Sequence, residues 1–300
     1  MNKTATAPFG PGSTIGILGG GQLGRMAAFA AQQMGYHCHI FCPENNAPAA
    51  EVSGHATTAA YDDEAALAAF AEKVDLVTFE FENIPSTAAA FLAARRPMRP
   101  SLGVLETCQD RLQEKTFCNA LGIATAPFAP VSSLQDLEAA AAKIGRPAVL
   151  KTNRMGYDGK GQVGIGPSDE LTTAWQSLSG GGPADAILEG FVDFQLELSV
   201  IVARSPSGEM QCFVPVENRH KNHILDETLA PAKIAVPLAA EAEAIAQKIA
   251  AEIGLEGILA VEMFLDRADR LLVNELAPRP HNSGHWTIDA CITSQFEQFI

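Results

Sequence analysis

Two apolar segments near the end of the sequence are each interrupted by a glutamate, and this pattern strongly restricts the fold. Residues 258–265 (ILAVEMFL) contain Glu262, and residues 271–273 (LLV) run directly into Asn274 and Glu275. The polar segment between them has the length of a hairpin connection. In one register the two glutamates face each other directly, whereas a shift of one residue leaves them as diagonal neighbours.

Two facing carboxylates repel each other unless a proton or a cation lies between them. Oxygen ligands of this kind suit a magnesium ion that carries a nucleotide phosphate. The alternative is a solvated pair of acids on an exposed face of the sheet. Residues 274–286 (NELAPRPHNSGHW) add an arginine and two histidines. Because burying so many polar groups without partners is costly, this segment is either a polar loop after an edge strand or part of a site.

Composition narrows the class of protein. The 300 residues are 47% hydrophobic, which suits two or three small domains with their own cores. A net charge of −14 argues against nucleic acid as a general partner, although it permits a local basic pocket for a small phosphate ligand. No apolar run is long enough to span a membrane. The six scattered cysteines form no zinc pattern and predict reduced thiols in a cytoplasmic protein.

The first structured segment predicts the opening of a doubly wound parallel sheet. Residues 13–18 (STIGIL) form an apolar strand, and a glycine-rich turn leads into a helix that ends at Gly35. Gly19, Gly21 and Gly24 fit the spacing G-x-G-x-x-G, whose backbone N–H groups can approach a phosphate. The next strand ends near Glu44, where a dinucleotide-binding fold has its ribose-binding acid. An NAD-dependent oxidoreductase is therefore one alternative, and a turn that needs glycine only for packing is another.

Polar residues at later strand ends are further candidates. Glu80 and Glu82 lie at and just after the end of the strand 76–81, at an edge where such sheets bind ligands, although a solvated edge is equally compatible. Residues 95–100 (RRPMRP) suggest a domain boundary. Arg111 and Lys115 share one face of a helix at 110–121. That spacing is typical of a solvated face, but Arg111 could point into a cleft.

A lysine and a glycine-rich loop predict phosphate handling in the middle of the chain. Lys151 ends the strand 146–151, and residues 152–162 (TNRMGYDGKGQ) contain three glycines and Lys160. The loop N–H groups and Lys160 can fold over phosphates while Lys151 supplies a fixed charge. The spacing is not that of a Walker P-loop, and a surface hairpin is the alternative. Glu197 begins another strand, where a carboxylate can accept two hydrogen bonds from a ribose diol.

Together these segments resemble the ATP-grasp superfamily and, within it, the 5-(carboxyamino)imidazole ribonucleotide synthases of purine biosynthesis. The resemblance extends from residue 19 to residue 286, nearly the whole chain. The motifs that carry it are GGGQLGRM (19–26), FEFENIP (79–85), DR (110–111), VLK (149–151), GYDGKGQ (156–162), VENRH (216–220) and NELAPRPHNSGHW (274–286).

The resemblance implies an α/β fold with a Rossmann-like (pre-ATP-grasp) parallel sheet, followed by a two-lobed α+β ATP-grasp domain. We expect the first domain at residues 1–105, with residues 1–12 as a disordered lead-in. The ATP-grasp domain is expected at residues 106–300, with a small lid lobe at about 127–190 and the large lobe in the remainder. Members of the family normally continue beyond the position of Ile300, so their small C-terminal domain is expected to be absent.

The implied reaction is ATP-dependent carboxylation of 5-aminoimidazole ribonucleotide by bicarbonate, through carboxyphosphate, giving ADP and phosphate. ATP and Mg²⁺ are the expected cofactors, and the protein is expected to be a cytoplasmic homodimer. The alternatives are another ATP-grasp ligase, such as a formate-dependent ribonucleotide transformylase, and a catalytically impaired fragment. The glycine loop at 19–24 is then expected to bind the substrate nucleotide and not NAD.

The resemblance also assigns site residues. The ATP-binding residues are Arg111, Lys151, Gly156, Tyr157, Asp158, Gly159, Lys160, Gly161, Gln162, Glu189, Gly190, Phe191, Val192, Glu197, His220, Asn274 and Glu275. The residues assigned to the ribonucleotide and bicarbonate are Gly21, Gln22, Leu23, Glu80, Glu82, Tyr157, Asp158, Arg279, His281 and Asn282. Those assigned to catalysis are Lys151, Tyr157, Asp158 and Arg279. Glu262 and Glu275 are expected to bind magnesium.

Overall fold

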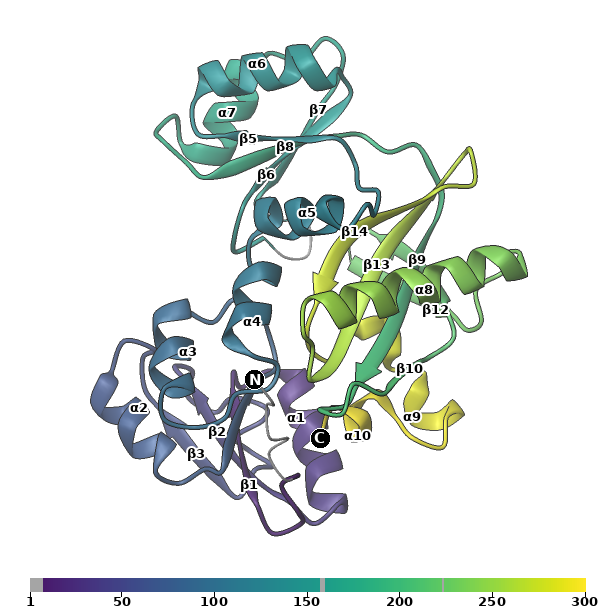
Figure 1. The fold of residues 1–300 in the computed structure, drawn as a ribbon. Helices are drawn as coiled ribbons and strands as arrows, with labels where there is room; N and C mark the ends of the chain where they lie inside the picture. Colours follow the sequence, from purple (N-terminus) through teal and green to yellow (C-terminus); the bar gives the residue numbers. More distant parts are fainter. Residues whose placement is uncertain (1–7, 157–159, 223) are drawn as a thin grey trace, which may run out of the picture.

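The computed structural model describes residues 8–156, 160–222 and 224–300. It has an N-terminal domain, a small lobe that we call the lid lobe, and a large lobe (Figure 1). In Figure 1 the N-terminal domain lies at the lower left, the lid lobe at the top and the large lobe at the right. Helix α5 (Arg111–Ala120) runs between the two lobes.

The N-terminal domain is built on a parallel sheet with the strand order β3-β2-β1-β4. Its strands are β1 (Thr14–Leu18), β2 (His37–Cys42), β3 (His55–Thr58) and β4 (Leu76–Phe79). Its helices are α1 (Gln22–Gln33), α2 (Glu64–Ala71), α3 (Ser86–Ala93) and α4 (Leu102–Cys108). Because β1 and β4 are parallel neighbours, the loops that follow them lie at the same carboxyl edge of the sheet. Such sheets bind ligands at this edge.

The lid lobe is an antiparallel sheet with the strand order β5-β8-β6-β7, packed against two helices. Its strands are β5 (Phe128–Val131), β6 (Ala148–Thr152), β7 (Gln162–Ile165) and β8 (Ala186–Gly190), and its helices are α6 (Leu134–Ile144) and α7 (Leu171–Ser179). Leu137, Leu150 and Trp175 are buried in its own small core. This core is separate from that of the large lobe. Lys151 on β6 therefore belongs to a separately packed lobe.

The large lobe is a six-stranded antiparallel sheet in which β10 pairs with β9 beside the main order β12-β11-β9-β13-β14. Its strands are β9 (Phe194–Arg204), β10 (Met210–Cys212), β11 (Val216–Lys221), β12 (Ile224–Leu229), β13 (Gly257–Asp266) and β14 (Leu271–Ala277). Helix α8 (Val236–Glu252) packs on this sheet. The short helices η1 (Asn282–Gly284), α9 (Thr287–Ala290) and α10 (Gln295–Phe299) follow β14.

The predicted hairpin is formed by β13 and β14, and of the two registers considered it has the one in which the glutamates face each other, with a shift just beyond Glu262. Glu262 pairs directly with Glu275, and the polar segment 266–270 forms the connection. Two prolines help to set the bounds of other elements of the large lobe. The chain leaves the sheet between β10 and β11, where Pro215 cannot donate a ladder hydrogen bond. Helix α8 begins at Val236, because a proline in its first turn is compatible with helix initiation.

The α/β fold class expected from the sequence is confirmed, with a parallel N-terminal sheet and two antiparallel sheets after it. Residues 1–7 of the expected lead-in lie outside the described residues. Residues 8–12 are held against the domain, since the Tyr36 hydroxyl donates to the Phe9 carbonyl (2.9 Å) and the Gly12 N–H donates to the Gly35 carbonyl (2.7 Å). All six cysteines are free thiols. Among the described residues, no helix combines the length and apolar character needed to cross a membrane.

Candidate active site

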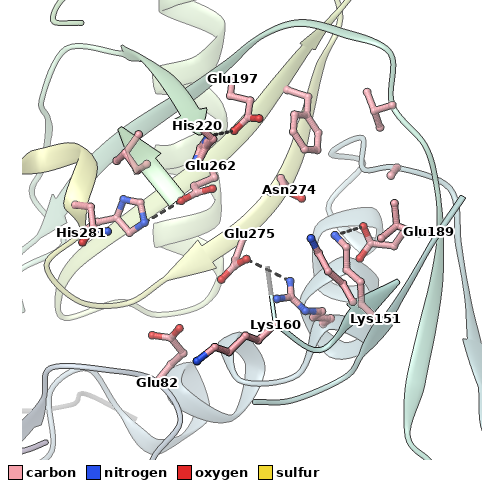
Figure 2. A pocket seen from close by; sticks show the side chains of 18 of the residues that line it. Glu82, Lys151, Lys160, Glu189, Glu197, His220, Glu262, Asn274, Glu275 and His281 are labelled. Carbon is pink, nitrogen blue, oxygen red and sulfur yellow. Dashed lines mark hydrogen bonds and ion pairs between the residues drawn. The ribbon is translucent and has the colours of Figure 1, made fainter. Parts of the chain in front are cut away.

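A cavity of about 540 Å³ lies where the N-terminal domain and the two lobes meet. This volume is typical of a small-molecule site. Glu82 comes from the N-terminal domain, Lys151 and Glu189 from the lid lobe, and Glu262 and Glu275 from the large lobe (Figure 2). A loop of the N-terminal domain and strands of the two lobes therefore contribute ionisable groups to one shared space.

The facing glutamates of the large lobe each pair with a basic side chain. Glu262 Oε1 lies 2.8 Å from His281 Nε2, and Glu275 Oε2 lies 3.2 Å from Arg111 Nη1. Burial by itself raises the pKa of Glu262, but the charge and hydrogen bond of His281 outweigh it and hold the pKa below the usual value. Each acid therefore has a basic partner of its own, which offsets the repulsion between the two carboxylates.

The oxygen atoms at this place fit a magnesium ion. Besides the two carboxylates, the Asn274 side-chain oxygen is buried and has no hydrogen-bond partner. In the described part of the chain, no group of three or more His, Cys, Asp or Glu side chains is arranged to hold a metal ion. Two carboxylates without a full protein cage match the way Mg²⁺ binds when nucleotide phosphates complete its shell.

A buried glutamate joins two lysines at the other side of the cavity. Lys151 Nζ lies 2.9 Å from Glu189 Oε2, and Lys115 Nζ lies 3.4 Å from Glu189 Oε1. Burial raises the pKa of Glu189, yet the two lysines outweigh that effect and lower it overall. Burial lowers the pKa of Lys151 despite Glu189. The solvated face expected for Lys115 is wrong, because α5 lies between the lobes and leaves this side chain only 1% exposed.

The first glycine loop is occupied by a side chain of the same domain. The N–H groups of Gly21 and Gly24 donate to Glu80 Oε1 (2.6 Å) and Oε2 (2.9 Å). A Cβ atom on Gly21 would lie 2.7 Å from Glu80 Oε1, so glycine is needed for this approach. Because these N–H groups are already paired with a carboxylate, the geometry argues against a dinucleotide pyrophosphate at this turn.

Arg279 connects the large lobe to the N-terminal domain. Its guanidinium donates two hydrogen bonds to the carboxylate of Glu82, the second of them at 3.1 Å. Burial raises the pKa of Glu82, but Arg279 outweighs it and lowers the pKa overall. The Gln109 amide donates to the backbone carbonyls of Glu82 (2.6 Å) and Ile84 (2.5 Å), and so holds the loop in place. These contacts orient both charged groups toward the cavity.

Glu197 and His220 form the remaining pair of the cavity. Glu197 Oε2 lies 2.6 Å from His220 Nδ1, and this hydrogen bond raises the pKa of the imidazole. Neighbouring strands β9 and β11 present the two side chains on one face of the sheet (Figure 2). The predicted contact of this pair with a nucleotide stays a prediction.

Most of the site residues expected from the sequence come together here, although the role of each stays a prediction. The expected residues that line the cavity are Gln22, Leu23, Glu80, Glu82, Arg111, Lys151, Lys160, Gln162, Glu189, Gly190, Phe191, Val192, Glu197, His220, Glu262, Asn274, Glu275, Arg279, His281 and Asn282. Gly21, Gly156 and Gly161 are not among its lining residues. Tyr157, Asp158 and Gly159 lie outside the described residues.

Four supporting residues were not expected from the sequence: Gln109, Glu114, Lys115 and Gln295. Gln295 is fully buried, and its amide pairs with both backbone groups of His281, accepting from the N–H (2.9 Å) and donating to the carbonyl (2.8 Å). Burial raises the pKa of Glu114 to about 8. No local pattern marks these residues, since each acts on a segment distant in the sequence.

Two family models match the chain. The ribonucleotide synthetase preATP-grasp domain matches residues 13–109, and the ATP-grasp domain matches residues 116–296. The fold and the cavity are therefore those of an ATP-grasp ligase. The N5-carboxyaminoimidazole ribonucleotide synthase of Brucella melitensis is 47% identical over 300 residues, which cover 100% of this chain and 82% of the relative. The chain belongs to the N5-carboxyaminoimidazole ribonucleotide synthase family.

Three further proteins are similar to this chain over nearly its whole length. The bifunctional purine synthesis protein of Dictyostelium discoideum is 51% identical over 97% of this chain, which spans about 30% of that protein's length. The N5-carboxyaminoimidazole synthetase of Staphylococcus aureus, solved with ADP, is 37% identical, with a TM-score of 0.91 over 97% of this chain and 77% of that one. The Aspergillus clavatus synthase, solved with ADP and 5-aminoimidazole ribonucleotide, is 28% identical, with a TM-score of 0.88 over 96% and 75%.

Proposed function

We propose that this chain catalyses the ATP-dependent carboxylation of 5-aminoimidazole ribonucleotide, as a step of purine biosynthesis. The proposal rests on one observation: the facing Glu262 and Glu275 share a cavity with the Lys151–Glu189 pair of the lid lobe, which lies across from them (Figure 2). Membership of the family supports the identity of the substrate. Its relative from Aspergillus clavatus was solved with that ribonucleotide and ADP.

The proposed chemistry has two steps, with bicarbonate as the source of carbon. An oxygen of bicarbonate attacks the γ-phosphorus of ATP, the bond from that phosphorus to the bridging oxygen breaks, and ADP leaves. The product, carboxyphosphate, is a mixed anhydride. The amine nitrogen of the ribonucleotide then bonds to the carboxyl carbon, phosphate leaves with the bridging oxygen, and the amine loses a proton. Activation is necessary because bicarbonate is a poor electrophile.

The proposed reaction brings several anions together. The cationic side chains of the site would reduce the repulsion between them. In this proposal Lys151 and Arg111, which line the cavity, bind ATP phosphates, and Arg279 binds bicarbonate or carboxyphosphate. Fixed charges in a site shielded from water stabilise developing charge more strongly than they would in solvent. Magnesium held by Glu262 and Glu275 would neutralise phosphate charge when bound. The glycine-rich segment 156–162, of which residues 157–159 lie outside the described residues, is proposed to exclude water that would hydrolyse the intermediate.

A test of the proposal is ADP release from ATP–magnesium with and without 5-aminoimidazole ribonucleotide at fixed bicarbonate. Release that depends on the ribonucleotide and on bicarbonate supports the proposal. Release that depends on formate would indicate a transformylase, which family membership does not favour. ATP binding without ribonucleotide-dependent release would indicate a catalytically impaired protein. The occupied glycine loop disfavours an oxidoreductase, which would bind NADH with a change in fluorescence.

The proposal also includes the oligomeric state and the cellular location of the protein. We expect a homodimer, which light scattering combined with size-exclusion chromatography would detect as twice the mass of the chain. A cytoplasmic location is expected from the scattered free cysteines and from the reaction itself, and cell fractionation tests it.

A further inference from the structure

Strand β14, which carries Glu275, is the last strand of its sheet in the described part of the chain. Glu275 lies directly opposite Glu262, and the register shifts immediately beyond this pair, so that Asn274 is an extra residue with no partner on β13. The Asn274 carbonyl and the Leu276 N–H lie on the outer edge, since both bind side chains of α5. Such an edge presents backbone groups with no strand to bind them. Further along, Val273 is held by the Ala124 carbonyl, which accepts from its N–H at 2.8 Å.

Two consecutive side chains of α5 take the place of a strand at this edge. Lys115 Nζ donates to the Asn274 carbonyl (3.1 Å), and the Leu276 N–H donates to Glu114 Oε2 (2.8 Å). These two contacts flank Glu275 on either side. Glu114 and Lys115 are 2% and 1% exposed, so water does not compete for their hydrogen bonds. We refer to Glu114 and Lys115 as the α5 clasp.

The clasp also reaches the lid lobe, through Lys115 alone. Lys115 pairs with Glu189, whose other oxygen pairs with Lys151. A continuous set of contacts thus runs from the backbone beside Glu275 to the lysine of the lid lobe. Glu114 has no part in this second connection: its Oε1 is buried without a hydrogen-bond partner, and its Oε2 binds Leu276.

We propose that Glu114 and Lys115 are positioning residues of the active site, which hold the Glu275 carboxylate in place for the metal ion. Lys115 in addition sets the position of the Glu189–Lys151 pair relative to Glu275. This inference rests on the proposed function, because it takes Glu275 as a ligand of the ion that ATP carries. Groups that orient a metal ligand from behind commonly affect metal affinity about 10- to 100-fold when removed.

Removing Glu114 and removing Lys115 should cause different losses of binding affinity. A general loss of stability would not produce this difference. Glu114→Ala frees the Leu276 N–H but leaves Glu189 and Lys151 paired. It should weaken Mn²⁺ binding in the presence of ADP about 10-fold and leave metal-free ADP binding unchanged. Lys115→Met releases Asn274 and Glu189 together, so both affinities should fall about 10-fold. Glu114→Gln keeps an oxygen for the Leu276 N–H and should recover the metal affinity.

The experiment measures Mn²⁺ binding by electron paramagnetic resonance and ADP binding by titration calorimetry, on the whole chain. The matched controls are Glu138→Ala and Lys143→Met, which remove an exposed acid and an exposed lysine from α6. Circular dichroism and thermal unfolding show whether each variant is folded. Should Lys115→Met fail to fold, the comparison of Glu114→Ala with Glu114→Gln still decides the question.

Glu275→Gln separates this inference from the proposed function. If Glu275→Gln binds Mn²⁺ as the wild type does, Glu275 is not a ligand, and both the metal assignment and the clasp are rejected. If Glu275→Gln loses Mn²⁺ while Glu114→Ala binds it normally, only the clasp is overturned. Equal losses in Glu114→Ala and Glu114→Gln would also overturn it, because the hydrogen bond to Leu276 would then not be the cause.

Discussion

Glu262 and Glu275 lie directly opposite each other on β13 and β14, and each pairs with a different basic side chain. His281 follows β14 in the same lobe, whereas Arg111 lies in the first turn of α5. The repulsion between the two acids is therefore offset by groups from two elements. A divalent ion with its phosphate ligands suits the same oxygens, so nucleotide binding and the geometry of this hairpin should depend on each other.

The Glu275→Gln variant should lose ATP turnover and keep its fold. The amide preserves the volume of the side chain but removes the charge that would hold magnesium, so we expect steady-state ADP release to fall about 100-fold. Glu241→Gln on the exposed side of α8 is the matched control. An unchanged rate in Glu275→Gln, at a magnesium concentration near that of ATP, would reject the metal assignment.

The Lys151→Ala variant should raise the KM for ATP. A hydrogen bond to a charged group contributes about 1.5–3 kcal/mol, which corresponds to about a 10- to 100-fold change in KM. Glu189 retains Lys115 in this variant, so the lid lobe should stay folded. Initial rates over a range of ATP concentrations give the KM, with Lys143→Ala as a control. ATP kinetics equal to those of the wild type would count against a phosphate contact by Lys151.

The Glu80→Ala variant should destabilise the N-terminal domain. It leaves the N–H groups of Gly21 and Gly24 without their acceptor, and an unpaired buried donor costs about 1–3 kcal/mol. Urea unfolding measures the change, and Glu72→Ala removes an exposed glutamate of the same domain for comparison. Equal stability of the two variants would mean that the glycine loop does not depend on Glu80.

Acid should destabilise the N-terminal domain through His39. This side chain is 3% exposed, and burial, assisted by Lys73 and His55, lowers its pKa from 6.5 to about 4. Between these values the unfolded chain binds a proton that the folded chain does not. The stability that neutral His39 contributes is therefore present above pH 6.5 and is lost as the pH falls through about 4, by a total of about 3 kcal/mol.

Urea unfolding between pH 7 and pH 4 tests this expectation against His39→Gln, which lacks the titration. The wild type should lose more free energy of unfolding than the variant over that range. Parallel curves for the two proteins would show that His39 does not titrate as expected.

The Gln295→Ala variant should disturb the segment that carries His281. Both backbone groups of His281 lose a buried partner, so we expect a loss of about 2 kcal/mol in the free energy of unfolding. Gln298→Ala removes an exposed glutamine from the same short helix and should have little effect. If thermal unfolding does not distinguish the two variants, the amide of Gln295 does not hold this segment.

Features that depend on neighbouring residues could be predicted from the sequence. Two apolar segments and a short connection predicted the hairpin of β13 and β14 and restricted the two glutamates to facing or diagonal positions, because hairpin length restricts the pairing. The glycine turn after β1 and the lysine at the end of β6 are local patterns of the same kind. Motifs spread from residue 19 to residue 286 indicated the family, and through it most of the residues that line the cavity.

Only the tertiary structure decided which partner each polar group has. The spacing of Gly21 and Gly24 suits a phosphate, yet the acceptor is Glu80, 59 positions from Gly21 in the sequence. The spacing of Arg111 and Lys115 suits a solvated face, yet Lys115 lies between the lobes and pairs with Glu189. Local sequence determines which way a strand or helix can present its side chains. Packing between distant segments determines which charged side chains pair with each other. The reason is that a buried polar group needs a partner, and only the folded chain supplies it.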